Sequence, residues 1–289
     1  MKKIIAILAG FALLPAQLFS WSAKGHAIVA GLAYSRLNPT AKENIRLLLG
    51  NDSLASVAAW ADEIRKDRDE TFGWHFVDIP KDADGFAQPR DCFRPQDKDK
   101  HPSAQNDHHN CVVDRIEMFR QVLADENASR DDRVAALKFL VHFVGDVHQP
   151  LHGIDEARGG NDIKVSVFGS DQCGNYSCNL HGVWDYSLIE HTGYSEDEYV
   201  SHLKNVVRKQ QLEQKAGGSP EDWANESFHD ARKIIGEHGA SVDDAYYQAN
   251  IGLVDERLAL AGLRLAALLN DTLGKIPTKQ LQQDLEKHN

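Results

Sequence analysis

A histidine and an aspartate in the stretch His142-Phe-Val-Gly-Asp146 have the spacing of two ligands for one metal ion. Residues four apart lie on one face of a helix, so both side chains can point at the same ion. Residues 134–147 are apolar on nearly every helical face, and an unpaired carboxylate buried there would be costly. About two such pairs are expected by chance in this composition, but a bound dication would supply the charge that this buried carboxylate lacks.

Further side chains of the same two types are spread along the chain. Six of them are candidate ligands: His26, Asp62, His75, His152, His181 and Asp185. His181 and Asp185 repeat the four-residue spacing, and His152 follows Pro150, which ends the preceding helix. Nitrogen and carboxylate donors without thiolates suit Zn²⁺ in an open catalytic site better than a closed structural site. The sequence therefore predicts a catalytic zinc centre.

Other histidines and the neighbouring tryptophans have simpler interpretations. Four histidines are expected to be solvated or hydrogen-bonded rather than metal ligands: His101, His108, His109 and His148. Three tryptophans are expected to pack around the metal ligands: Trp60, Trp74 and Trp184.

The four cysteines that follow the N-terminal apolar segment favour two local disulfides. Cys173 and Cys178 enclose a short loop, and Cys92 and Cys111 bracket a charged, histidine-bearing loop. An even number of cysteines in an exported chain usually indicates disulfides. A cysteine-based zinc site is the alternative, but neither pair has the short gap and the matching second pair of such sites.

Residues 1–20 have the pattern of a secretory signal peptide. Two lysines precede an apolar run from Ile4 to Leu14, Pro15 breaks it, and the small Ser20 stands before Trp21. The run is too short to span a bilayer stably, although an uncleaved anchor is the alternative. Cleavage between Ser20 and Trp21 predicts a secreted or periplasmic protein that is soluble and does not bind membranes. We also expect a monomer without a stable protein partner.

The charge of the chain excludes one class of nucleic-acid-binding protein. The 289 residues carry 32 Lys and Arg against 43 Asp and Glu, a formal charge of −11, and loss of the two leader lysines makes it −13. Proteins that bind duplexes through a broad basic surface have the opposite balance. If this protein binds nucleic acid, bound cations must attract the phosphates.

The elements that position the candidate ligands are predicted to be mainly α-helical. Helices are expected over 39–49, 112–123, 130–147, 196–211, 219 or 220 to 235, and 242–273. Helix 130–147 is apolar enough to lie in the middle of a bundle. One strand is expected over 163–168, with loops over about 79–110 and 169–180. The fold class is a single-domain helical bundle over 21–275, with a small β-hairpin or short strands and a polar tail over 276–289.

Taken together, these motifs resemble the secreted zinc-dependent single-strand nucleases of the S-one/P-one type, which share a helical scaffold with zinc-dependent phospholipase C. The matching segments, in the order of that family, are Trp21-Ser-Ala-Lys-Gly-His26, Trp60-Ala-Asp62-Glu-Ile-Arg65, His75-Phe-Val-Asp78, His142-Phe-Val-Gly-Asp146-Val-His-Gln-Pro-Leu-His152, Gly159-Gly-Asn-Asp162 and His181-Gly-Val-Trp-Asp185.

The resemblance implies a site with three Zn²⁺ ions. The first would be held by Asp62, His75, His142 and Asp146, the second by His152, His181 and Asp185, and the third by Trp21, His26 and Asp146. Trp21 would bind through its α-amino group and carbonyl, so this ligand would exist only after the leader is removed. Zinc can deprotonate an α-amino group, whose ordinary pKa is about 7.7–8.0, near neutral pH.

The resemblance also implies the reaction, which is hydrolysis of single-stranded DNA and RNA to products with a 5′-phosphate. Asp62 would orient the attacking water and Arg65 would neutralise charge on the phosphorane. Phe76 would stack on a base, Asp78 would hydrogen-bond its edge, and Asn161 would shape the other wall of the pocket. Stacking requires an unstacked base, which favours single strands. The preference between DNA and RNA and activity on 3′-nucleotides stay open.

Two other functions are compatible with a zinc centre in a helical, exported protein. A zinc-dependent phospholipase C would have a similar site, together with an apolar rim and a cage for choline. A non-catalytic zinc-binding protein would need neither Arg65 beside the metals nor an open coordination position. The motifs His75-Phe-Val-Asp78 and Gly159-Gly-Asn-Asp162 favour the nuclease.

Overall fold

The computed structural model describes residues 21–93, 107–237 and 239–287. The leader predicted over 1–20 and His101 lie outside these residues. The helices are α1 (Ala23–Arg36), α2 (Pro39–Leu49), α3 (Trp60–Ile64), α4 (Gln88–Asp91), α5 (Val112–Ala124), α6 (Arg130–Asp146), α7 (Leu180–Gly182), α8 (Leu188–His191), α9 (Glu196–Gln210), α10 (Pro220–Glu237), α11 (Asp244–Asp271) and α12 (Thr278–Lys287). The 3₁₀ helices are η1 (Asp69–His75), η4 (Pro150–Gly153), η6 (Leu212–Lys215) and η7 (Leu273–Lys275), and η5 (Val183–Ser187) is a π-helix.

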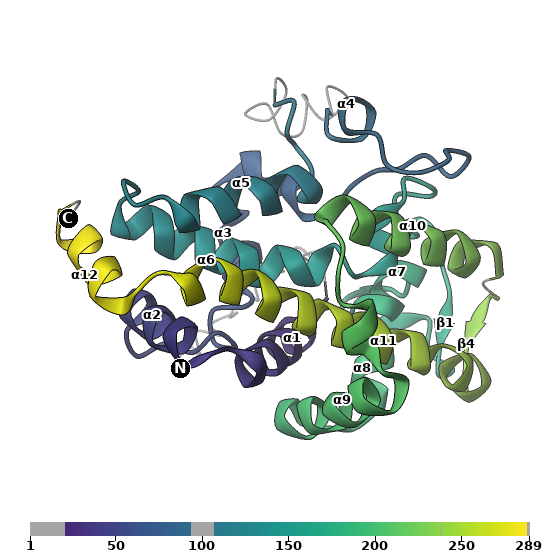
Figure 1. Ribbon diagram of the computed structural model, residues 1–289. Coiled ribbons are helices and arrows are strands. Elements are labelled where there is room, and N and C mark those ends of the chain that lie inside the picture. The colour runs from purple at the N-terminus through teal and green to yellow at the C-terminus, as the bar shows by residue number, and fades with distance from the viewer. Residues whose placement is uncertain (1–20, 94–106, 238, 288–289) are drawn as a thin grey trace, which may run out of the picture.

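The long helix α11 crosses the middle of the molecule, and α1, α6 and α9 pack against it (Figure 1). Helix α5 covers the other side of α6. Gly262 on α11 lets α1 approach closely, because an added Cβ there would lie 2.8 Å from Leu32. Buried apolar side chains from these helices form one continuous core. The mainly α-helical fold class predicted from the sequence is confirmed.

Local sequence signals account for where several helices begin and end. At α2, the Asn38 side chain accepts a hydrogen bond from the amide of Ala41, Pro39 occupies the first turn, and Gly50 ends the helix with φ +67°. At α9, Ser195 and Glu198 form a capping box. The predicted helices therefore agree with the structure to within a few residues, and α6 is buried on nearly all faces, as predicted.

The strand predicted over 163–168 is mostly absent. Only β1 (Ser166–Val167) forms a ladder, and it is parallel to β4 (Ser241–Val242). Because β4 has just two residues, the ladder is limited to two residue pairs. The expected hairpin is formed by β2 (Gln172–Cys173) and β3 (Tyr176–Ser177), within the predicted loop 169–180.

The short helices α3, α4, α7 and α8 were not predicted from the sequence, and neither were two longer helices, α1 and α12. Helix α1 is buried on almost every face, so it shows little helical periodicity. Residues predicted as a polar tail include α12, which packs against α2 and buries Leu281 and Leu285. Among the described residues, none of the helices has the length and apolar character needed to cross a membrane.

Candidate metal centre

Helix α6 presents the central pair of the site at its C-terminal end. His142 and Asp146 are both fully buried, and Nε2 of His142 lies 3.2 Å from Oδ2 of Asp146. The helix places these side chains one turn apart on the same face, which is the arrangement that the four-residue spacing predicts.

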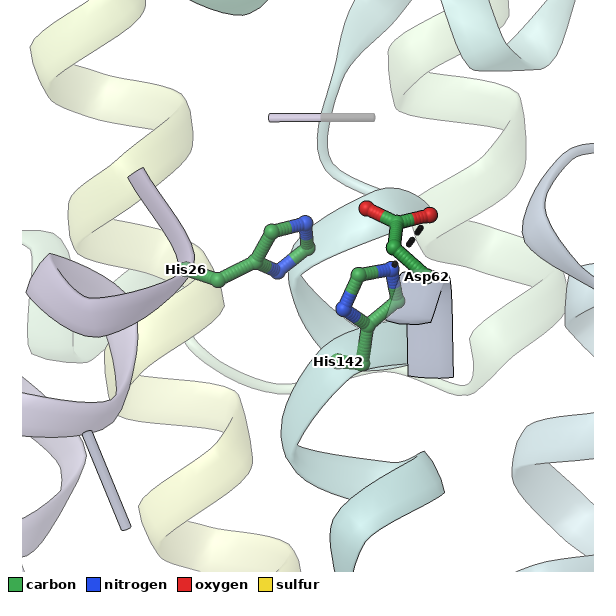
Figure 2. Close-up of side chains that lie close together, drawn as sticks. All are labelled: His26, Asp62 and His142. Carbon is green, nitrogen blue, oxygen red and sulfur yellow. Dashed lines mark ion pairs between the residues drawn. The ribbon is translucent and has the colours of Figure 1, made fainter. Parts of the chain in front are cut away.

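Side chains from three other elements converge on this pair. His26 on α1 places Nε2 3.3 Å from Oδ1 of Asp146, and His75 at the end of η1 places Nδ1 3.0 Å from Oδ2. Asp62 on α3 has Oδ1 3.7 Å from Nε2 of His142. Figure 2 shows His26, Asp62 and His142 pointing toward one another from separate elements. Five donor residues therefore surround a common centre.

A second group lies next to the first. Nε2 of His181 is 3.2 Å from Oδ2 of Asp185, and Nε2 of His152 is 3.8 Å from its Oδ1. His152 is also within 4.0 Å of Asp146. His181 lies on α7 and Asp185 on the π-helix η5, a helix type often found at functional sites. The two groups therefore form one continuous polar centre in the core.

Backbone carbonyls fix the orientation of three of these histidines. Nδ1 of His142 donates to the carbonyl of Ala58 (2.7 Å), Nδ1 of His152 to that of His75 (2.9 Å), and Nδ1 of His181 to that of Gly159 (2.7 Å). Since a carbonyl oxygen can only accept, Nδ1 carries the proton in each neutral ring. Each Nε2 lone pair is then available to the centre, which is the usual arrangement of metal-ligating histidines.

The start of the described chain is attached to both groups. The buried Trp21 indole donates to the carbonyl of Gly145 (3.0 Å), next to Asp146. The Ser22 amide donates to the carbonyl of Asp185 (2.9 Å). These two hydrogen bonds hold the backbone of Trp21 beside the centre.

The electrostatics of the centre favour a bound cation. Burial, followed by the charge of Arg65, lowers the pKa of His75 to about 4, and burial, followed by His152, lowers that of His181 to about 3. Burial raises the pKa of Asp185 well above its usual range, with Asp146 and Asp62 adding to the effect. The central His142 differs: burial lowers its pKa, but the charges of Asp146 and Asp62 outweigh burial and raise it to about 9, so this ring binds a proton when no other cation is present. A dication would replace that proton, and it would stabilise both the neutral imidazoles and the Asp185 carboxylate, which lacks countercharge.

The donor set also fits zinc in its chemistry and spacing. Two nitrogen or oxygen ligands of one tetrahedral zinc ion lie about 3.3 Å apart. The nearest donor atoms here lie 3.0–3.8 Å apart, and none of these donors is a thiol. The residues present therefore fit zinc, and the His/Asp clusters can bind metal.

Arg65 and the segment after His75 border the centre. Nη1 of Arg65 is 3.3 Å from Oδ1 of Asp62, and its side chain is 18% exposed. The segment after His75 alternates, with Val77 and Ile79 buried and Phe76 and Asp78 half-buried. An extended chain places alternate side chains on opposite faces, so Phe76 and Asp78 share the more open face.

Asn161 lies in a turn that supports the second group. Its Nδ2 donates to the carbonyl of Arg158 (2.9 Å), while the exposed Arg158 side chain pairs with Asp162. Ala157 and Arg158 have φ near +50°, and Gly159 and Gly160 are also left-handed. This unusual turn directs the Gly159 carbonyl at His181.

The histidines and tryptophans that were not expected to bind metal have other partners. His148 donates from Nδ1 to the carbonyl of Val144 and accepts from Arg264 at Nε2. His109 pairs with Asp114, and His108 stacks on Phe93. Trp60 and Trp74 pack on Phe139, and Trp184 is fully buried.

The cysteines form the two local disulfides that the sequence favoured. Cys92 is bonded to Cys111, and Cys173 to Cys178. Cys92 and Cys111 also lie close to Asp114 in an arrangement that could hold a metal. A disulfide offers no thiolate, so the alternative of a cysteine-based zinc site is wrong.

Two contributors to the site were not singled out from the sequence. Gln149 donates to the carboxylate of Asp185, and Phe72 contacts both Arg65 and Phe76. Gln149 lies inside the segment His148-Gln-Pro-Leu-His152, so its position was the only signal available. Phe72 gives no signal of its own, because a phenylalanine in a helical segment usually indicates core packing.

Comparisons with known proteins identify the family of this chain. The sequence profile described as S1/P1 nuclease matches residues 21–274. Endonuclease 2 of Arabidopsis thaliana is 30% identical over 286 residues, covering 89% of this chain and 92% of the relative. Endonuclease 3 of the same plant is 31% identical, with 86% and 88% covered. Nuclease P1 of Penicillium citrinum is 29% identical, with 88% and 98% covered.

Proposed function

The chain belongs to the S1/P1 nuclease family and is therefore a hydrolase of phosphodiester bonds, and on this premise we propose that it cuts single-stranded DNA and RNA with the help of three zinc ions. The products carry a 5′-phosphate, and nucleotides are also substrates or ligands. The observation that carries the proposal is the convergence of buried histidines and carboxylates from α1, α3, η1 and α6 on Asp146.

We propose the following zinc ligands. One ion is held by Asp62, His75, His142 and Asp146, a second by His152, His181 and Asp185, and a third by His26, Asp146 and the α-amino group and carbonyl of Trp21. Asp146 can serve two ions because its two oxygens face different histidines, with Oδ1 toward His26 and Oδ2 toward His142. The position of Trp21 between the two groups supports its assignment.

The side chains around the ions have separate tasks in hydrolysis. Bound zinc supplies an acidified water and electrostatic attraction for the phosphate oxygens. Asp62 accepts a hydrogen bond from the attacking water and holds its direction. Arg65, held 3.3 Å from Asp62, donates to the oxygens as negative charge develops at phosphorus. This reaction requires no protein nucleophile.

The preference for single strands follows from the open face beside the ions. Phe76 and Asp78 share that face, so the ring can stack on a base while the carboxylate accepts from its edge. Asn161 forms the opposite wall of this pocket. A base in a duplex is already stacked and paired, so it cannot enter without being unstacked.

We infer that the protein acts after export. Two disulfides are consistent with an oxidising compartment, and the third zinc site needs the free amine that cleavage before Trp21 creates. The active unit is a monomeric nuclease domain over 21–275, followed by the C-terminal segment 276–289, and it requires neither a membrane nor a stable protein partner.

Hydrolysis assays with the zinc-loaded chain starting at Trp21 test this function. The protein is incubated with single-stranded DNA, RNA, duplex DNA and phosphatidylcholine, and the products are separated by chromatography. We expect 5′-phosphorylated fragments from both single strands, slower cleavage of the duplex and intact lipid, with activity abolished by a chelator and restored by zinc. Hydrolysis of the lipid alone would indicate a phospholipase, and zinc binding without any hydrolysis would indicate a non-catalytic protein.

A further inference from the structure

The aromatic ring of Phe72 lies between two side chains that the proposed reaction uses. The guanidinium carbon of Arg65 is 5.0 Å from the centre of this ring. The ring of Phe76 meets it edge to face, with centroids 5.6 Å apart and planes inclined by 81°. Phe72 therefore links the arginine that faces the phosphate to the phenylalanine that faces the base.

Local backbone structure produces this arrangement. Phe72 lies in η1, and Phe76 immediately follows that helix. Arg65 ends the short helix α3, one turn after Asp62, to which its guanidinium is paired. Phe72 is half-buried, so part of the residue packs against its neighbours and part is exposed, and its ring contacts Phe76 on the more open face.

Both contacts restrict side chains that would otherwise move. A guanidinium over an aromatic face is attracted by the partial negative charge of the ring's π-electron face, more strongly when water is excluded. Edge-to-face packing likewise limits the rotation of the Phe76 ring. Holding groups in the binding geometry before the substrate arrives reduces the cost of ordering them.

We propose that Phe72 is a positioning residue that couples phosphate binding by Arg65 to base binding by Phe76. This inference rests on the proposed nuclease function and on the tasks given there to Arg65 and Phe76. Loss of the ring should loosen both side chains. A looser Arg65 should weaken the reaction of every phosphodiester, whereas a looser Phe76 should weaken only the binding of substrates that carry a base. The two effects are therefore separable by choice of substrate.

The test compares three variants of the zinc-loaded protein. Phe72→Leu keeps an apolar side chain but removes both aromatic contacts, and Phe72→Tyr restores the ring. Phe119→Leu is the control, because Phe119 is a half-buried phenylalanine that stacks on Phe139 in the core. Melting temperature and zinc content are measured for each variant to compare their folding.

Two substrates separate the two contacts. One is a dinucleotide, and the other is bis(4-nitrophenyl) phosphate, a phosphodiester without a base. We expect Phe72→Leu to lower kcat by about 3- to 30-fold on both, as expected for loss of a cation–π contact, and to raise KM on the dinucleotide alone. Phe72→Tyr should stay within about twofold of the parent protein, and Phe119→Leu should change neither constant.

Binding of thymidine 5′-monophosphate, measured by calorimetry, gives a readout that does not depend on turnover. We expect Phe72→Leu to weaken it by about 3- to 30-fold, and Phe119→Leu to leave it unchanged. Equal constants for Phe72→Leu and Phe119→Leu, or losses that Phe72→Tyr does not restore, would overturn the inference. A parent protein that binds the nucleotide but cleaves neither substrate would instead contradict the proposed function, and the binding comparison would still decide the role of Phe72.

Discussion

The imidazole rings of His26 and His142 stack face to face in the interior, with centroids 3.8 Å apart and planes inclined by 15°. The two residues come from α1 and α6 and are both fully buried. Burial, followed by the charge of His142, lowers the pKa of His26. Burial and the neighbouring His142 therefore favour the neutral form of His26, whose Nε2 lies toward Asp146, and the proposed role as a zinc ligand requires that form.

A methyl group added at Gly145 tests whether the position of His26 is needed for zinc binding. A Cβ at residue 145 would lie 2.7 Å from Nδ1 of His26, closer than real contacts allow. We expect Gly145→Ala to displace His26, remove about one zinc ion per chain and lower kcat/KM at least about 10-fold. Elemental analysis and kinetics check this. The control is Gly252→Ala in α11, where an added Cβ meets nothing within 4 Å; full zinc content in both variants would contradict the role of His26.

Replacing Asp146 should lower the activity more than replacing Phe76, the residue proposed to stack on the base. On the proposed ligand assignment, Asp146→Asn removes a charge that two ions would share, so we expect loss of zinc and a drop in kcat/KM of more than about 10³-fold. Phe76→Ala would remove only the proposed stacking on a base, which is worth about 1–3 kcal/mol, or about 5- to 150-fold in kcat/KM. Kinetics on single-stranded DNA with zinc analysis compare the two variants. The reverse order would refute the bridging role.

The free amine of Trp21 should be needed for one of the ions. A mature chain with one glycine added before Trp21 is expected to lose about one zinc ion and most of its activity, since the α-amino group is moved away from the centre. A chain with one glycine added after Asn289 is the control. An N-terminally extended protein with the zinc content and activity of this control would disprove the amine assignment.

His148 should make the fold less stable in acid. Burial, followed by the charges of Arg264 and Arg257, holds its pKa well below the usual 6.5. As the pH falls below 6.5, the unfolded chain binds a proton that the folded chain does not bind, so stability is lost. Between pH 7 and pH 5 the titration of this residue should lower the free energy of unfolding by about 2 kcal/mol.

Urea unfolding with a chelator present, at both pH values, measures this contribution. Glutamine cannot titrate, so the free energy of unfolding of His148→Gln should fall between pH 7 and pH 5 by about 2 kcal/mol less than that of the parent protein. The other histidines affect both proteins alike, so they cancel in the difference. Equal losses would show that His148 binds a proton in the folded state.

Much of the site could be predicted from the sequence because its signals are local. The spacing of His142 and Asp146 and the apolar surroundings on α6 are properties of one helix, as are the cap at Asn38 and the stop at Gly50. Helical period and capping depend on residues a few positions apart. The sequence by itself therefore determined which side chains could bind metal and where most long helices lie.

The tertiary structure decided which partners these side chains have. The carbonyl of Ala58 orients His142 from 84 residues away, and Arg264 occupies Nε2 of His148 from 116 residues away. Such contacts depend on how whole elements pack, and packing is set by the summed burial of many side chains rather than by any local pattern.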